Sequence, residues 1–223
     1  MGESRIDVES CMGKRVLAIF DFDGTIADSG AWFADALNEV ARRNGFREVT
    51  ADQHDTLRGL STREIFAHLG IPSWKLPLIV RQLRAIAARD AGEIRAFPWV
   101  PDVLAALRSR GVAVAIVSSN TKANILRVLG REVAAMIDQF GTGAPLFGKT
   151  AKINTVIDRC GSTAALTTSI GDEVRDIEAA RALGVNSLAV TWGYATAAAL
   201  QAAEPTRLVH APDELLDWFA QKL

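Results

Sequence analysis

Short apolar runs alternate with helical patterns along the chain. Residues 15–21 form an apolar run without polar alternation, which is typical of a strand buried on both faces. Similar runs occupy residues 112–118, 167–172 and 187–192, and residues 136–140 form a weaker fifth candidate. Because helical patterns separate these runs, we predict right-handed βαβ crossovers and an α/β fold, a doubly wound parallel sheet with a Rossmann-like core.

The helical patterns between the strands have recognisable ends. Pro101 lies near the first turn of one helix, which Gly111 ends, and a second helix begins near residue 176 and ends at Gly184. The alanine-rich residues 195–203 favour another helix.

One long segment interrupts the alternation of strands and helices. It contains helical patterns over residues 31–43, 62–69 and 76–91. No convincing buried strand separates these helices. We therefore predict an all-helical cap subdomain over residues 30–97, inserted into a catalytic core made of residues 1–29 and 98–223.

Composition and net charge limit the kinds of molecule that the protein is expected to bind. With 223 residues, 49% hydrophobic and 23% charged, the chain has a globular composition. A net charge of −1 favours no nucleic-acid partner, and no apolar run approaches the roughly 20 residues of a membrane helix. Cys11 and Cys160 lack metal-ligand spacing, so we expect a reduced, cytoplasmic protein. A monomer or a homodimer fits equally well.

The most informative motif follows the first predicted strand, at residues 21–25 (Asp-Phe-Asp-Gly-Thr). Two carboxylates beside a glycine are common in surface turns, so alone the motif is weak. However, ligands of open parallel sheets bind at the carboxyl ends of the strands. Three further polar signals lie at or beyond other predicted strands, namely Ser118-Ser119-Asn120, Lys149, and Asp172-Glu173 with Asp176. Each of these also has an ordinary interpretation as a helix cap or a solvated charge.

Together these residues could carry out phosphoryl transfer. Asp21 and Asp172 offer the hard oxygen ligands that Mg²⁺ prefers, and Lys149 adds positive charge at the transferring phosphoryl group. Ser118 can hydrogen-bond the phosphoryl oxygens. Asp21 would be the nucleophile that forms an aspartyl-phosphate, and Asp23 would protonate the leaving oxygen and then activate water.

The chain resembles the haloacid dehalogenase-like superfamily, and within it the phosphoglycolate-phosphatase-like hydrolases with a helical cap. The four motifs of the family are matched, in order, by residues 21–25, Ser118, Lys149, and residues 171–173 with Asp176. The resemblance covers the chain from about residue 16 to its end.

The resemblance implies roles for the acidic residues. Metal ligands would be Asp21, the backbone carbonyl of Asp23, and Asp172, whereas Asp176 would support them and Glu173 would reach the metal through water. It also implies the cofactor, Mg²⁺, and a cap inserted between the first and second motifs.

Other residues are candidates for substrate contacts. Residues 58–64 look like a cap segment that presents an arginine to the substrate, and Arg63 is our candidate. In the core motifs we assign Thr25, Ser119 and Asn120 to substrate binding. A cap that closes over the site predicts a small phosphorylated metabolite, such as phosphoglycolate or a sugar phosphate.

Alternatives remain open. Residues 143–150 match the phosphate-binding pattern G-x-x-x-x-G-K-[ST], which would make the protein a nucleotide-binding kinase or ATPase with Asp172 as metal ligand. That interpretation leaves Asp21 unexplained. A phosphomutase would use the same pair of aspartates, and a non-catalytic binding protein usually lacks one of them. Lys152 lies one helical turn beyond Lys149 and competes with it for the lysine role.

Overall fold

Strand β1 (Leu17–Phe20) is completely buried, because helices cover both faces of the sheet to which it belongs. The computed structural model describes residues 14–50, 53, 57–58, 60, 62–90, 92–143 and 148–222, without the side chains of Thr62 and Arg63. Within this part of the chain, six parallel strands form one sheet in the order β5-β4-β1-β6-β7-β8. No helix there is long and apolar enough to span a membrane.

The other elements follow the predicted alternation. The remaining strands of this sheet are β4 (Ala113–Val117), β5 (Gln139–Gly141), β6 (Thr167–Gly171), β7 (Asn186–Val190) and β8 (Arg207–Val209). The helices of the core are α5 (Val100–Ser109), α6 (Lys122–Ala134), α7 (Lys149–Arg159), η4 (Ala164–Leu166), α8 (Val174–Ala182), α9 (Ala197–Ala202) and α10 (Asp213–Ala220).

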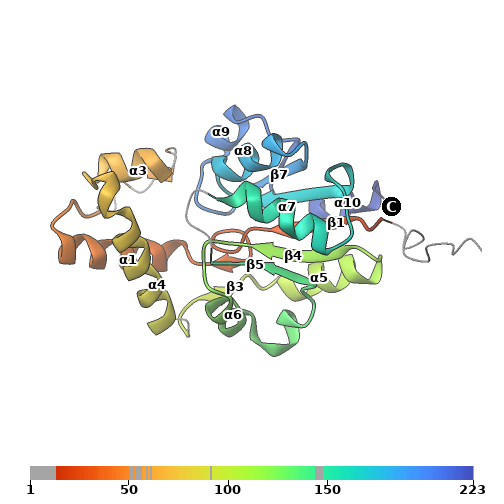
Figure 1. Cartoon of the computed structure of the whole chain (residues 1–223), viewed down its shortest axis with the longest axis horizontal. Helices are drawn as coiled ribbons and strands as arrows, with labels where there is room; N and C mark the ends of the chain where they lie inside the picture. Colours follow the sequence, from red (N-terminus) through yellow and green to blue (C-terminus); the bar gives the residue numbers. More distant parts are fainter. Residues whose placement is uncertain are drawn as a thin grey trace, which may run out of the picture.

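Successive residues of β1 face opposite layers of helices. Ala18 and Phe20 pack in one cluster with α5, α6 and α10, whereas Leu17 and Ile19 pack in another with α7 and α8. Figure 1 shows α7, α8 and α9 above the sheet, with α5 and α6 below it. The predicted doubly wound α/β fold is confirmed.

Strand β8 corrects the sequence analysis, which ended the sheet at residues 187–192. Residues Arg207–Val209 pair in parallel with β7 and extend the sheet by one strand. Only Val209 of the three is buried, so the segment lacks the apolar run by which the other strands were recognised.

Helices α1 (Gly30–Asn44), α3 (Thr62–His68) and α4 (Leu76–Arg89), with the short helix η3 (Ser73–Lys75), form an insertion between β1 and β4. They enclose an apolar cluster of their own, which includes Leu37, Phe66 and Ile79. In Figure 1 they stand apart from the sheet, on its left.

The two connections between insertion and core pair with each other. Strands β2 (Ala27–Asp28) and β3 (Arg95–Ala96) are antiparallel and form a separate two-stranded sheet. Two residues are too few to show a hydrophobic period, so no sequence pattern indicates this pairing. The boundaries of the cap at residues 30 and 97 stay a prediction.

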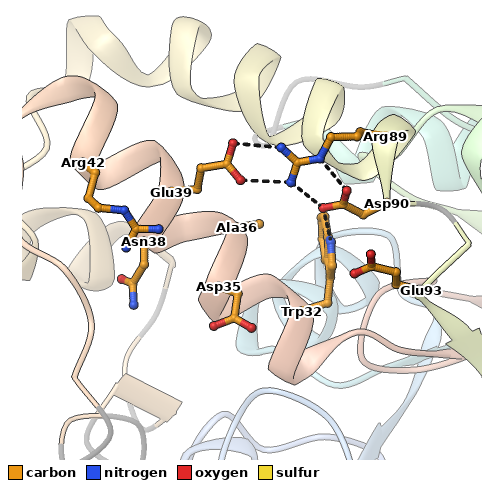
Figure 2. A pocket seen from close by; sticks show the side chains of 9 residues that line it. All are labelled: Trp32, Asp35, Ala36, Asn38, Glu39, Arg42, Arg89, Asp90 and Glu93. Atoms are coloured by element: carbon orange, nitrogen blue, oxygen red, sulfur yellow. Dashed lines mark hydrogen bonds and ion pairs between the residues drawn. The ribbon is translucent and has the colours of Figure 1, made fainter.

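Arginine 89 joins α1 to the end of α4. Its guanidinium donates hydrogen bonds of 3.0 and 2.9 Å to Glu39, and others of 2.5 and 2.8 Å to Asp90. The indole of Trp32 also donates to Asp90, at 3.2 Å. Figure 2 shows this network beside a cavity of about 500 Å³ on the insertion. Hydrogen bonds from Arg89 lower the pKa values of Glu39 and Asp90.

Candidate active site

The strands that carry the predicted motifs end side by side. Phe20 of β1 is in register with Ile116 of β4 and Ile170 of β6. Asp21 directly follows β1 and Asp172 directly follows β6, so both carboxylates leave the sheet at its carboxyl edge. Open parallel sheets bind ligands at this edge.

Lys149 joins two buried carboxylates. Its Nζ atom lies 2.9 Å from Oδ1 of Asp21 and 2.6 Å from Oδ1 of Asp176. Lys152, the competing candidate, instead donates a 3.5 Å hydrogen bond to the carbonyl of Gly141. Of the two lysines, Lys149 is the one that contacts the acidic residues.

Asp172 is completely buried and held on both of its oxygens. Thr25 Oγ1 donates a 2.6 Å hydrogen bond to Oδ1, and the backbone N–H of Tyr194 donates a 2.7 Å bond to Oδ2. Two glycines make room for this carboxylate. A Cβ atom on Gly24, whose φ is +79°, or on Gly193 would lie within 2.3 Å of an Asp172 side-chain oxygen.

Three of these carboxylates form a cluster. Oxygens of Asp21, Asp172 and Asp176 lie within 4.8 Å of one another. Burial raises the pKa of Asp21, which Lys149 partly opposes, and burial together with Glu173 raises the pKa of Asp172. Such crowding disfavours two negative charges unless a cation balances them. The buried oxygen donors therefore fit a divalent cation such as Mg²⁺.

Asp23 lies beside this cluster in a different environment. Its Oδ2 accepts a 3.4 Å hydrogen bond from Nδ2 of Asn120. Its Oδ1 is buried and has no hydrogen-bond partner in the described part of the chain. Burial, and then the charge of Asp21, raise the pKa of Asp23 to about 7. A carboxyl group of this kind can hold a proton near neutral pH.

The polar residues after β4 organise one another. The backbone N–H of Asn120 donates a 3.0 Å hydrogen bond to Oγ of Ser118. The cap of α6 is neither Ser119 nor Asn120 but Thr121, whose hydroxyl accepts from the backbone of Asn124. The interpretation of Ser119 and Asn120 as helix caps is therefore wrong, and the side chain of Asn120 contacts Asp23 instead.

Glu173 and Asp176 both cap helix α8. The side chain of Glu173 accepts from the backbone of Asp176, and Oδ2 of Asp176 accepts a 3.1 Å hydrogen bond from the backbone of Glu173. The interpretation of these acidic residues as caps of a helix N-terminus is therefore confirmed. Asp176 nevertheless also binds Lys149, so it serves the helix and the site together.

A cavity of about 1230 Å³ opens beside these residues, between the core and the insertion. Asp23 and Lys149 line it from the core, and Trp32, Phe33 and Leu37 of α1 line it from the insertion. The site therefore has a polar floor and a largely apolar wall on the other side, as expected for a small-molecule pocket.

Comparison with known proteins decides the family. A family model described as haloacid dehalogenase-like hydrolase matches residues 18–190. The chain belongs to this family. It is 33% identical over 204 residues to a phosphoglycolate phosphatase of Synechococcus elongatus, covering 91% of this chain and 96% of that one. A phosphoglycolate phosphatase of Agrobacterium fabrum is 31% identical over 192 residues, which cover 80% of this chain and 81% of the relative.

Solved structures agree on the fold of this haloacid dehalogenase-like hydrolase. A haloacid dehalogenase-like hydrolase of Streptococcus pneumoniae has a TM-score of 0.77 at 24% identity, covering 92% of this chain and 98% of that one. The predicted family and the predicted enzyme class, a phosphatase, are confirmed. The phosphate-binding-loop alternative falls largely on residues 144–147, which lie outside the described residues.

Sequence reasoning missed the residues by which the hydrolase joins its insertion to its core. Arg58 donates hydrogen bonds of 3.0 and 3.1 Å to the carbonyls of Gly193 and Tyr194. Arg84 of α4 donates bonds of 3.1 and 2.9 Å to the carbonyl of Ser119. Because the acceptors are main-chain oxygens, no residue type in the sequence indicates these contacts.

The sequence analysis also did not identify Tyr194, which contacts both the core and the insertion of the hydrolase. Its hydroxyl lies 2.7 Å from Oγ of Ser29, and its ring stacks on Phe33 with centroids 5.5 Å apart. The side chain of Arg63, the arginine predicted to reach the substrate, lies outside the described residues.

Proposed function

We propose that this phosphatase hydrolyses a small phosphomonoester through a covalent aspartyl-phosphate on Asp21. The observation that supports this most strongly is the setting of Asp21. Its carboxylate is buried at the end of β1, 2.9 Å from the ammonium group of Lys149 and in one cluster with Asp172. A carboxylate needs such cationic help to approach a phosphate dianion.

The cofactor in this proposal is Mg²⁺. Asp21 and Asp172 would hold it, together with the backbone carbonyl of Asp23 that the family resemblance implies, and Thr25 would keep Asp172 in place. When bound, the metal offsets negative charge on the phosphoryl group. Asp176 would act by orienting Lys149, and Glu173 would contact the metal through water.

The chemistry then needs two proton transfers by Asp23. In the first step an Asp21 oxygen attacks phosphorus, the ester P–O bond breaks, and protonated Asp23 gives its proton to the leaving oxygen. In the second step the Asp23 carboxylate takes a proton from water, the water oxygen attacks phosphorus, and the P–O bond to Asp21 breaks. Inorganic phosphate leaves, and Asp23 is protonated again. Its position next to Asp21 and its raised pKa support this role.

The remaining core residues would bind the phosphoryl oxygens. We assign this role to Lys149 and Ser118, with Ser119 and Asn120 lining the cavity. Thr25, which the sequence analysis assigned to substrate binding, donates its one hydroxyl proton to Asp172 and so acts by holding that carboxylate. Residues 30–97 would be the cap that shields the intermediate, with Arg63 reaching the substrate from it. The cavity between core and insertion has room for a small metabolite, and the names of the relatives make 2-phosphoglycolate the first substrate to test.

The test is phosphate release from a panel of phosphomonoesters, with Mg²⁺, with EDTA, and by the Asp21→Asn variant. Asparagine keeps the size of the side chain and removes the nucleophilic charge. We expect release to require both the metal and Asp21. Equal phosphate release by wild type and Asp21→Asn would contradict the proposal. Transfer of the phosphoryl group to an added sugar in place of water would identify a phosphomutase.

A further inference from the structure

We propose that Arg175 binds a carboxylate of the substrate, and so selects phosphomonoesters that carry a second anionic group close to the phosphate. This inference rests on the proposed function and adds a specificity residue to it. Arg175 lies in the first turn of α8, three residues after Asp172, and lines the same cavity as Asp23 and Lys149.

Four basic side chains of the described residues line this cavity, and three of them have structural partners that account for their position. Arg58 binds the carbonyls of Gly193 and Tyr194, and Arg84 binds the carbonyl of Ser119. These two side chains join the insertion to the core. Lys149 is engaged by Asp21 and Asp176.

Arg175 differs from these three in the state of its hydrogen bonds. Its Nη2 donates a 2.5 Å hydrogen bond to Glu173, which anchors one end of the guanidinium. Its Nε is buried and has no partner among the described residues. A guanidinium has five N–H donors in a planar fork, and a buried donor left unpaired is unfavourable. The side chain as a whole is 28% exposed and lines the cavity, so other donors of the guanidinium are left for a ligand there.

The chemistry of the guanidinium favours a carboxylate as that ligand. Two parallel N–H donors match the two oxygens of a carboxylate, which a lysine cannot do. Arg175 lines the same cavity as Asp23 and Lys149, and its charge partly opposes the raised pKa values of Asp21 and Asp23. In 2-phosphoglycolate only one carbon separates the ester oxygen from the carboxylate. A cation in the cavity that Asp23 and Lys149 also line is therefore placed to meet the second anion of such a short substrate.

The alternative roles of Arg175 are to bind the phosphoryl group itself or only to balance the acidic cluster. Two substrates separate these roles. They are 2-phosphoglycolate and 2-hydroxyethyl phosphate, which has the same two carbons with a hydroxyl in place of the carboxylate. Either alternative role affects both substrates equally, whereas carboxylate binding affects only the first.

The experiment compares wild type, Arg175→Gln and Arg175→Lys on both substrates, with circular dichroism melting to check folding. We expect Arg175→Gln to lower kcat/KM for 2-phosphoglycolate at least about tenfold more than for 2-hydroxyethyl phosphate, mainly through KM. Arg175→Lys should recover part of the difference. The matched control is Arg181→Gln on the same helix, because Arg181 binds the carbonyl of Glu204 outside the cavity. Arg181→Gln should leave kcat/KM unchanged for both substrates.

Binding measured without turnover keeps this inference separate from the catalytic proposal. In the Asp21→Asn background, calorimetry should show that Arg175→Gln weakens binding of 2-phosphoglycolate at least about tenfold more than binding of 2-hydroxyethyl phosphate. Equal losses for the two compounds, or no preference of the unmodified protein for the carboxylate, would overturn the inference. Either result leaves the role of Asp21 intact, whereas failure of Asp21→Asn to abolish phosphate release would overturn the mechanism and not this contact.

Discussion

The ammonium group of Lys149 lies 2.6 Å from the carboxylate of Asp176, which links the first turn of α7 to the first turn of α8. Burial disfavours the charge of this lysine, but Asp176 and Asp21 outweigh it and raise its pKa. Asp176 also receives the backbone N–H of Glu173. The same aspartate therefore starts a helix and holds the lysine against Asp21.

This relationship predicts that Lys149→Met lowers kcat/KM by about 100-fold or more, because the transferring phosphoryl group loses its fixed positive charge. The measurement is phosphate release under saturating Mg²⁺. Lys152→Met is the matched control, since in the described part of the chain its ammonium group donates to the carbonyl of Gly141 and to no carboxylate. It should change kcat/KM by less than about threefold, within the range of surface substitutions. A larger loss in the control than in Lys149→Met would reverse the assignment.

Removing the hydroxyl that supports Asp172 should weaken the metal site. Thr25→Val keeps the shape of the side chain and removes the 2.6 Å hydrogen bond to Oδ1 of Asp172. Partners that orient metal ligands typically contribute about 10- to 100-fold in metal affinity. We expect the Mg²⁺ concentration for half-maximal activity to rise about tenfold. Thr155→Val removes a hydroxyl that donates to the carbonyl of Ala151 within its own helix, and it should leave this Mg²⁺ concentration unchanged. An unchanged metal requirement in Thr25→Val would contradict the assignment of Asp172.

The contact of Arg58 with the core should matter for substrate retention. Arg58→Met removes hydrogen bonds of 3.0 and 3.1 Å to the carbonyls of Gly193 and Tyr194, so the insertion is held less firmly over the cavity. Two such bonds predict a rise in KM of about tenfold, with a smaller change in kcat. Arg42→Met is a suitable comparison, because Arg42 pairs with Glu48 within the insertion. If both variants kept the wild-type KM, the insertion would not be held by Arg58.

The main elements could be predicted because each strand of the sheet centre is an uninterrupted apolar run. The motif residues could be located because parallel strands end at a common edge, which brings Asp21 and Asp172 together from positions far apart in the chain. Strand β8 could not be predicted, because Arg207 and Leu208 are only partly buried and the strand is three residues long.

The residues that complete the cavity were harder to predict for a different reason. The sequence presents Arg175 as an ordinary solvated charge in the first turn of a helix, and only the fold places it in the lining of the cavity. Arg58, Arg84 and Tyr194 act on main-chain groups or on residues distant in sequence. Such contacts have no local pattern.

The ion-pair network of Figure 2 predicts how the stability of the protein depends on pH. Arg89 lowers the pKa values of Glu39 and Asp90 below their ordinary values of about 4. A lowered folded-state pKa adds stability above the unfolded-state pKa, and this stability is lost as the pH falls through the folded-state pKa. The unfolding free energy of wild type should therefore exceed that of Arg89→Gln at pH 7, and the difference should shrink below about pH 4.

Urea unfolding at pH 7 and pH 3 measures this difference. Arg81→Gln on the same helix is the control, because Arg81 has no ion-pair partner in the described part of the chain. Its effect should be the same at both pH values. A deficit of Arg89→Gln that grew toward pH 3 would contradict the network.

The most direct test of the central claim is to identify the residue that carries the phosphoryl group. The Asp23→Asn variant should form the intermediate from p-nitrophenyl phosphate, whose leaving group needs no proton from Asp23, and hydrolyse it slowly, because the variant has no base to activate water. After reaction with p-nitrophenyl phosphate and acid quenching, borohydride reduces an acyl phosphate of aspartate to homoserine. Peptide mass spectrometry should find homoserine at position 21. Phosphate release with no modified residue, or a label on any other side chain, would contradict the account.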